Sequence, residues 1–347
     1  MAKRVLHLVG SPVDPLMAEL SRLYARDCLE ATSDLHDYES VVAHVDPGGR
    51  WRLPLGSGPE AIDEASLEAA TPLLAHEALS RIATLGVSVV LPQMFCVPGM
   101  TAYRDLWTVM GVPLIGNCGS TMALGADKAD ARAVVAAAGV DVPAGQVVGP
   151  GALPDLPFPF VVKPVDADNS AGVTLVRTEV DVEPALAAAL RHSPAALVET
   201  YIEAGREVRC GIVEHDGELV FLPLEEYRLD PGHPIRTQVD KIDRPDGPNL
   251  RLMAKDPQVA WKVDTADPVT QSVWDLAATC HRSLGCRDHS LFDVRIDPSG
   301  RPWFLEASLY CSFARQSVVI GMAEAAGIRL VRLFTESVER AIGRGPG

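Results

Sequence analysis

Two acids thirteen positions apart, Asp293 and Glu306, lie with Arg295 in a stretch suited to metal and phosphate chemistry. Carboxylates directly opposite each other on neighbouring strands have Cβ atoms about 4.5–5.5 Å apart and repel each other. A shared proton, the nearby arginine or a divalent cation must offset that repulsion. Donors that are all oxygen suit Mg²⁺, which one or two carboxylates commonly hold together with nucleotide phosphates. A solvated network of acids and an arginine is the alternative that this stretch alone leaves open.

A β-hairpin must position these side chains. Two β-prone runs, 291–296 and 302–307, flank the turn residues 297–300. A two-residue loop, Ser299-Gly300, places the two acids opposite each other and gives a second face that is wholly apolar, with Phe292, Val294 and Ile296 opposite Ala307, Leu305 and Trp303. A three-residue loop is also plausible by turn chemistry, but that slip would mix the faces. The sequence therefore favours the shorter loop.

The composition narrows the class of protein. The chain has 347 residues, which predicts two or three packed units, and a formal charge of −15 without a long basic run. This charge argues against a nucleic-acid partner. The seven cysteines form no C-x-x-C pair, and no apolar stretch is long enough to span a bilayer. We expect a cytoplasmic protein without a signal peptide or membrane partner.

Strands alternate with helices in residues 1–124, which predicts an α/β unit with a parallel sheet. Asp14 caps the first helix, whose inward stripe is expected to be Leu16, Leu20, Leu23 and Tyr24. The expected strands are 4–9, 41–45, 87–91 and 113–115, and the later helices are 66–85 and 102–110.

Two α+β units are expected to follow. Residues 125–203 hold helices 128–138 and 182–190, with short strands at 146–148, 160–163, 173–176 and 196–199. Residues 204–347 hold strands 207–213 and 219–224, the hairpin, and helices 268–284, 315–326 and 330–341. Residues 228–267 have little periodicity, which is typical of a functional lid or a disordered loop.

Four segments in this order, GADKADARAVVAAAGVDVP, PFVVKPVDADNSAGVTLV, LVETYIEAGREVRCGIV and LFDVRIDPSGRPWFLEA, resemble the ATP-grasp fold in its D-alanine–D-alanine ligase branch. The resemblance covers about residues 110–330. It implies an N-terminal parallel-sheet domain, two ATP-grasp subdomains, ATP and Mg²⁺ as cofactors, and small-molecule substrates. It also implies a homodimer.

The resemblance also implies roles for individual residues. For the nucleotide, it assigns the phosphates to Lys128 and Lys163, a phosphate-covering loop to the segment with Ser170, the adenine to Glu199, Tyr201 and Ile202, and the ribose to Glu207. For the reaction, it assigns Mg²⁺ to Asp293, Glu306 and Ser308, charge stabilisation to Arg295, the acceptor carboxylate to Ser317, and a lid contact with phosphate to Lys241, with Lys255 as its rival. Ser308 departs from the usual asparagine, and a hydroxyl is the poorer Mg²⁺ ligand.

The first unit departs from D-alanine–D-alanine ligases. Residues 10–14 and 91–101 lack the groups expected to bind the first D-alanine. HLVGSPVD, LPQMFCVPGMTAYRDLW, LPLEEYRLDPG and FLEASLYCSFARQSV look similar to mycosporine-glycine ligases, which implies condensation of L-Ser or L-Thr with mycosporine-glycine. A pocket with Met94, Phe95 and Tyr310 would then hold the ring, although these residues equally suit a core. Another dipeptide or amide ligase, or a non-catalytic nucleotide-binding protein, is the alternative.

Overall fold

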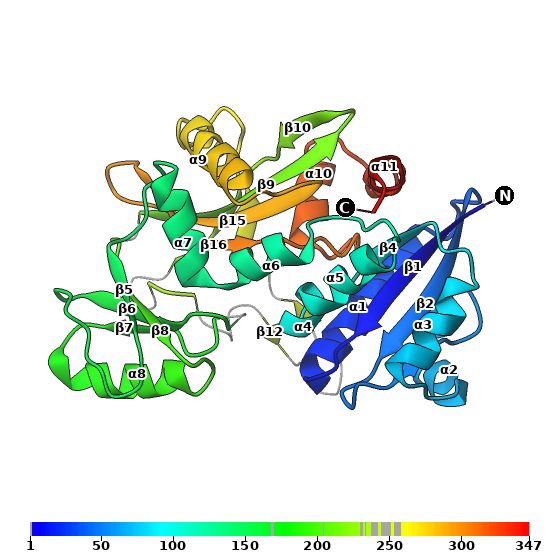
Figure 1. The fold of residues 1–347 in the computed structure, drawn as a ribbon. Helices are drawn as coiled ribbons and strands as arrows, with labels where there is room; N and C mark the ends of the chain where they lie inside the picture. The colour runs from blue at the N-terminus through cyan, green and yellow to red at the C-terminus, as the bar shows by residue number, and fades with distance from the viewer. Residues whose placement is uncertain are drawn as a thin grey trace.

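The structure is a computed structural model, and three sheets of four or more strands form its framework (Figure 1). It describes residues 2–167, 170–203, 205–229, 232, 234–236, 242–243, 251–252 and 258–346. Each of the three sheets is built from one of the sequence ranges 1–124, 125–203 and 204–347. The domain boundaries themselves stay a prediction. Residue 124 lies inside helix α6 (Gly119–Ala126).

The first sheet confirms the predicted parallel arrangement. Its order is β3-β2-β1-β4, with β1 parallel to both neighbours and only β3 antiparallel. A parallel bridge from Val90 to Leu114 replaces the strand expected at 113–115. The strands are β1 (Lys3–Gly10), β2 (Tyr38–Val45), β3 (Trp51–Arg52) and β4 (Val89–Pro92), and the helices are α1 (Pro15–Ala31), α2 (Glu64–Ala69), α3 (Ala75–Ala83), α4 (Val97–Met100) and α5 (Ala102–Val109), with a 3₁₀ turn at Pro59–Ile62.

Two predictions about these helices need correction. The single helix expected at 66–85 is two helices, because the chain turns extended at Ala70 and Pro72 follows. In α1 the buried stripe is centred on Ala18, Ala25 and Cys28 with Leu20, whereas Leu16, Leu23 and Tyr24 are half-buried. Small residues allow α1 to lie close to the sheet, and so the larger side chains flank the contact.

The second sheet is small and antiparallel, in the order β5-β8-β6-β7. Helix α8 (Val182–Leu190) packs Ala185, Leu186 and Ala189 against one face of it. Helices α6 and α7 (Lys128–Ala137) lead into this sheet, and Gly139 at φ +89° ends α7 as expected. The strands are β5 (Gly145–Val148), β6 (Phe160–Pro164), β7 (Thr174–Val176) and β8 (Ala196–Thr200), and a 3₁₀ turn spans Glu179–Asp181.

The third sheet has six antiparallel strands, in the order β14-β11-β9-β15-β16 with β10 beside β9. Its apolar face packs against α7 and α9, through Val208, Cys210, Phe292 and Val294. The strands are β9 (Arg206–His215), β10 (Glu218–Phe221), β11 (Glu225–Tyr227), β14 (Ala260–Lys262), β15 (His289–Ile296) and β16 (Pro302–Ser308), and the helices are α9 (Val269–Ser283), α10 (Val318–Ala325) and α11 (Leu330–Arg344).

Part of the range predicted to be a lid belongs to this sheet. Residues 260–262 form the edge strand β14, which pairs with β11. Residues 242–243 (β12) and 251–252 (β13) form a separate two-stranded ribbon. The expected strand at 219–224 is shorter, since β10 ends at Phe221 and β11 begins a new strand at Glu225. Strands of two or three residues are too short to show a two-residue period, so no pattern in the sequence predicts them.

The turn of the β15–β16 hairpin differs from the prediction. Ile296 lies opposite Pro302, which leaves a three-residue loop, Pro298-Ser299-Gly300, within the turn closed by Asp297. The Gly300 N–H donates to the Asp297 carbonyl, and Gly300 adopts φ +89°, a conformation that glycine tolerates without strain. The predicted two-residue loop is therefore wrong.

A β-bulge nevertheless keeps the predicted pairing of the acids. The register shifts by one position between Asp293 and Val294, and Leu305 is the extra residue. Asp293 thus lies opposite Glu306, as expected. Leu305 and Trp303 do not join the apolar face as predicted; Phe304 is buried in that core instead.

The first and third sheets are joined through α11. Phe334 and Val338 of this helix pack in one core with Val5 and Leu91 of the first sheet and Val213 of the third. In Figure 1, α11 accordingly lies between the two sheets. None of the helices in the described parts of the chain combines the length and hydropathy that crossing a bilayer requires.

Candidate active site

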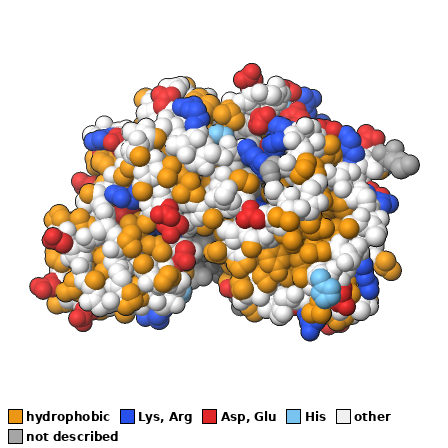
Figure 2. Space-filling model, viewed as in Figure 1, with side chains coloured by type: hydrophobic (Ala, Val, Ile, Leu, Met, Phe, Trp, Pro, Cys, Tyr) orange, Lys and Arg blue, Asp and Glu red, His pale blue; other side chains and the backbone are white. Residues whose placement is uncertain are grey.

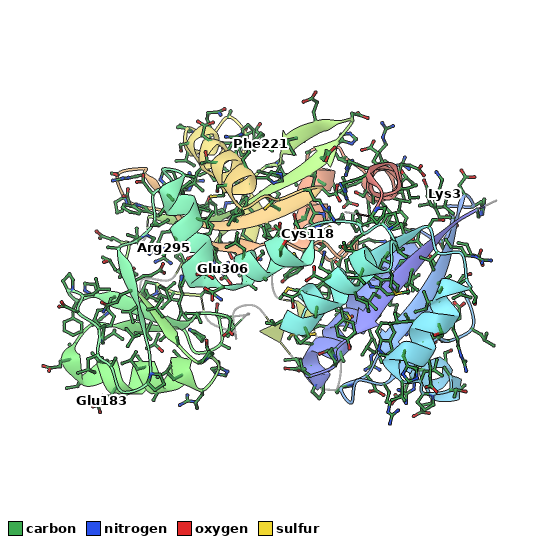
Figure 3. All side chains as sticks on the ribbon, in the orientation of Figure 1. Lys3, Cys118, Glu183, Phe221, Arg295 and Glu306 are labelled. Carbon is green, nitrogen blue, oxygen red and sulfur yellow. The ribbon has the colours of Figure 1, made fainter. Side chains whose placement is uncertain are left out.

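A pocket lies where the small sheet faces the polar side of the six-stranded sheet. Ten of the predicted site residues line it: Lys128, Lys163, Ser170, Glu199, Tyr201, Ile202, Glu207, Asp293, Arg295 and Glu306. Figure 3 labels Arg295 and Glu306, which lie on the side of the third sheet nearest the small sheet. In the same view, the surface is indented between the lobe that contains α8 and the N-terminal lobe (Figure 2). Residues more than 170 positions apart therefore meet at one site.

Strand alternation explains which side chains reach the pocket. On β15, Asp293 and Arg295 are two apart and share a face, while Phe292 and Val294 point into the core. Glu207 on β9 lies opposite Arg295 in the neighbouring strand. One face of the sheet therefore packs in the core, and these charged side chains lie on the opposite face, toward the pocket.

The small sheet contributes a buried ion pair. The Lys163 Nζ lies 2.5 Å from a Glu199 carboxylate oxygen, and Arg132 lies 3.4 Å from the other oxygen. Lys163 also donates to the Leu305 carbonyl at 3.3 Å, which connects the small sheet to the bulge of the hairpin. Glu199 was expected beside adenine, but its carboxylate is turned toward these two cations.

Lys128 reaches the hairpin from the start of α7. The Asp127 carboxylate caps this helix by accepting from the N–H groups of Ala129 and Asp130, both at 2.9 Å. Lys128 Nζ lies 3.1 Å from a Glu306 carboxylate oxygen and also donates to the Ala167 carbonyl. The two lysines therefore lie at the same pocket, beside the hairpin.

Arg295 is held by partners on three segments. Its guanidinium lies 2.5 Å from Glu207 and donates to the carbonyl oxygens of Ile202 at 3.3 Å and Pro234 at 2.9 Å. It also lies 5.6 Å from the centre of the Tyr201 ring. Arg295 therefore links the third sheet to the segment expected to hold the base.

The hairpin acids suit a divalent cation. Asp293 and Glu306 lie opposite each other, both line the pocket, and each offers only oxygen donors. Each acid also has a cationic partner: Arg209 lies 2.5 Å from Asp293, and Lys128 pairs with Glu306. These partners offset the repulsion between the acids, and so the donor set fits Mg²⁺ bound together with phosphate.

Some predicted residues lie elsewhere. Ser308 lines an adjoining pocket with Met100, Met122 and Tyr310, next to the main one. Ser317 is the N-cap residue that precedes α10, and it lines neither of these two pockets. Of the three residues expected around a ring, Tyr310 lines the adjoining pocket, whereas Met94 is fully buried in the core of the first sheet and Phe95 is 5% exposed, as the core alternative expects. Lys241, Lys255 and two loop residues, Asp168 and Asn169, fall outside the described residues.

Sequence reasoning missed several lining residues. Val161 could have been found, because it is two positions before Lys163 on β6 and so shares its face. Val173 and Leu305 add apolar surface, the latter only because of the bulge. Arg236 lies 3.5 Å from Glu207 and 3.4 Å from the Tyr227 ring centre, in a stretch without a periodic signal.

Comparisons with known proteins agree with this geometry. The family described as "D-ala D-ala ligase C-terminus" matches residues 152–339. A D-alanine–D-alanine ligase of Nocardia farcinica is 28% identical over 89% of this chain and 92% of its own length. One of Gloeobacter violaceus is 30% identical, covering 67% of this chain and 74% of its own length. These comparisons give no support to the narrower resemblance to mycosporine-glycine ligases.

Solved structures share the fold. The VanG D-Ala:D-Ser ligase from Enterococcus faecalis superimposes with a TM-score of 0.79 at 21% identity, over 98% of this chain and 100% of that one. A D-alanine–D-alanine ligase from Bacillus anthracis complexed with ATP gives 0.70 at 17% identity, over 99% of both chains. These structures show that the chain has the ATP-grasp fold, and the family match over residues 152–339 with the related ligases shows that it is an ATP-grasp carbon–nitrogen ligase that belongs to the D-alanine–D-alanine ligase family.

Proposed function

We propose that this protein uses ATP and Mg²⁺ to activate a carboxylate or carbonyl oxygen of one substrate and then joins the amine of an amino acid to it. One observation carries the proposal: Lys128 and Lys163, from separate elements, meet the paired acids Asp293 and Glu306 at one pocket. A triphosphate needs cations from several directions, and this pocket supplies them. Mg²⁺ held by the acids would neutralise phosphate charge.

The side chains of the chain itself would position the reactants. Lys128 and Lys163 would exchange their present carboxylate partners for phosphate oxygens. Arg295, held by Glu207 and two backbone carbonyls, would present a fixed guanidinium where negative charge develops. The substrate oxygen would attack the γ-phosphorus, ADP would leave, and the amine would then displace phosphate. No nucleophilic side chain is needed, since positioning and electrostatics supply the catalysis.

The decisive experiment measures ADP release from the purified protein with Mg²⁺, ATP and a panel of amino acids, with products identified by mass spectrometry. We expect ADP release that depends on an amino-acid pair, and a product one water lighter than the sum of its substrates. The variant Glu306→Gln should release no ADP above background while its circular dichroism spectrum shows that it stays folded. Nucleotide binding without turnover on any substrate would favour the non-catalytic alternative.

A narrower substrate pair is a second candidate. Four sequence segments suggest L-Ser or L-Thr with mycosporine-glycine, and the adjoining pocket, with Met100, Met122 and Tyr310 in its walls, favours a substrate with an apolar body. Methionine side chains adapt to irregular shapes, which suits such a substrate. Adding mycosporine-glycine and serine to the same assay tests it: absence of a condensed product, with dipeptide formed from other amino acids, would reject this pair alone.

We also propose that the protein is a cytoplasmic homodimer. The resemblance to dimeric ligases supports the dimer. The lack of an apolar stretch in the sequence long enough to span a bilayer supports the cytoplasmic location. Light scattering of the purified chain would measure the assembly, and a monomeric mass would exclude the dimer.

A further inference from the structure

A row of charged side chains crosses the polar face of the six-stranded sheet and ends at the metal-binding acids. In cross-strand register, Glu225 of β11 lies opposite Arg209 of β9, and Arg209 lies opposite Asp293 of β15. Lys262 of β14 and Glu306 of β16 extend the row at its two ends. Opposite charges alternate along the row except at the two acids of the hairpin.

Contacts within the row leave Asp293 already engaged by an arginine. The Arg209 Nε donates to an Asp293 carboxylate oxygen at 2.5 Å. On the other side of the arginine, Glu225 accepts from Lys262 and from the Tyr227 hydroxyl. Asp293 is therefore the only acid in the row, among the described residues, that shares an ion pair with Arg209.

Arg209 is held in place on several sides. Its side chain is 14% exposed, and its guanidinium lies 5.4 Å from the centre of the Tyr227 ring. Arg236 covers the same ring at 3.4 Å. A rotation of Arg209 away from Asp293 would break both the ion pair and the contact with the Tyr227 ring. The guanidinium is thus a fixed charge, unlike an exposed arginine.

A fixed cation changes what the acids can bind. A carboxylate that bridges two divalent ions with one oxygen on each would lose one of those oxygens to a guanidinium, whose charge also repels a second ion nearby. The third expected ligand is also weak, because Ser308 carries a hydroxyl and lines the adjoining pocket instead of the main one. The Arg209 guanidinium and the weak ligand Ser308 both disfavour a second divalent cation at this site.

We propose that Arg209 is a positioning residue that takes the place of a second metal ion: its guanidinium holds one Asp293 oxygen, so the site binds a single divalent cation with each nucleotide. This inference rests on the nucleotide binding proposed above. It assigns Arg209 a role that acts through Asp293, without contact to the nucleotide.

The test counts metal ions on the full-length protein. Mn²⁺ and the non-hydrolysable analogue AMP-PNP are titrated together, and bound Mn²⁺ is counted by electron paramagnetic resonance while bound nucleotide is counted by equilibrium dialysis. The wild type should bind about one Mn²⁺ per nucleotide, and Arg209→Gln should bind about two. Arg209→Lys, which retains a charge, should bind about one.

The matched control is Arg206→Gln. Arg206 belongs to the same strand but faces away from this row and pairs with Glu226 at 2.7 Å and Asp267 at 2.9 Å. The Arg206→Gln variant should bind as many Mn²⁺ ions per nucleotide as the wild type. About two Mn²⁺ in the wild type, or an unchanged count in a folded Arg209→Gln variant, would overturn the inference. Loss of AMP-PNP binding by the wild type would instead overturn the proposed function, so the two failures are distinguishable.

Discussion

At the scale of single residues, the pocket consists of charges that partner each other where a nucleotide would bind. Lys163 with Glu199 and Arg295 with Glu207 are close ion pairs with little exposure, and Lys128 is buried beside Glu306, whose side chain is 26% exposed. A buried pair is a weak source of stability, because desolvation offsets most of its attraction, but removing one partner leaves a costly unpaired charge. The cationic side chains of such a site could replace a carboxylate partner by a phosphate oxygen with little movement.

Lys163→Met should therefore have two separable effects. It should weaken ATP binding at least tenfold (about 1.4 kcal/mol), because a phosphate loses its cation, and it should destabilise the fold, because Glu199 loses its nearest partner. Isothermal calorimetry with AMP-PNP and a melting curve measure the two effects.

A double variant separates these effects. Lys163→Met with Glu199→Gln should recover much of the melting temperature without recovering nucleotide affinity. Lys262→Met is the matched control, because this lysine also pairs with a buried glutamate, Glu225, but lies outside the pocket lining. If the double variant binds AMP-PNP like the wild type, Lys163 is not a phosphate ligand.

At the scale of elements, helix α7 begins at Lys128, the residue proposed to bind phosphate. Lys128 is the first residue of the helix, and the Asp127 cap fixes the first turn. Loss of an N-cap costs about 1 kcal/mol and frays that turn. Asp127→Ala should consequently reduce nucleotide affinity several-fold as well as lower the melting temperature.

The α1 cap provides the comparison. Asp14 accepts from the N–H groups of Leu16 and Met17 at 2.7 and 3.1 Å, much as Asp127 does in α7, but α1 contributes nothing to the pocket lining. Asp14→Ala should lower the melting temperature by a similar amount and leave AMP-PNP affinity unchanged. Equal losses of affinity in both variants would mean that the effect is global destabilisation.

The hairpin shows what pattern reasoning can predict about an element. Alternation of apolar and charged residues predicted both faces of β15 correctly, because one face packs on a core. The loop length was wrong, since turn chemistry allowed two solutions and only packing selects between them. The three-residue turn and the bulge at Leu305 each shift the strand pairing by one residue, in opposite senses, so that Asp293 still lies opposite Glu306. Alternation of apolar and polar residues in the sequence does not reveal two shifts that cancel.

At the scale of the whole molecule, Asp288 ties the C-terminal helix to the first sheet. Its carboxylate is fully buried, pairs with Arg340 at 3.0 Å and Arg344 at 2.9 Å on α11, and accepts from the Gly116 N–H at 2.7 Å. Asp288→Asn should reduce the free energy of unfolding by about 3–5 kcal/mol, since Arg344 loses the carboxylate it pairs with and Arg340 keeps only Glu214 at 3.2 Å. Urea unfolding measures this loss.

An exposed pair is the control for this prediction. Asp216 and Arg332 lie 2.6 Å apart on the surface, with side chains 64% and 59% exposed. Solvent screens that attraction, so Asp216→Asn should leave the urea midpoint nearly unchanged. A similarly small effect of Asp288→Asn would show that α11 is held by its apolar contacts alone.

Buried histidines predict the acid response of the fold. Burial lowers the pKa of His7 and His281 to about 4 and that of His289 to about 3, from 6.5. Below pH 6.5 the unfolded chain therefore binds protons that the folded chain refuses, so stability falls as the pH drops toward 4. His7 alone contributes on the order of 3 kcal/mol over that range.

Melting temperatures between pH 7 and pH 4.5 check this expectation. His7→Gln, which can still bond to Gln93 and Ser40, should flatten the decline, whereas a change at the exposed His76 should not. A melting temperature independent of pH across this interval would contradict the assignment of neutral buried histidines.

The sequence by itself determined most of the order of strands and helices, the polar and apolar faces of β15, and ten residues of one pocket. These features follow from local periodicity and from motifs whose residues are close together in the chain. Tertiary structure alone decided the bulge at Leu305, the edge strand β14, the ion pair between Arg209 and Asp293, and the separation of Ser317 from the pocket. Each of these depends on which distant strands become neighbours, and the pairing of distant strands is set by packing of the whole core and leaves no local pattern in the sequence.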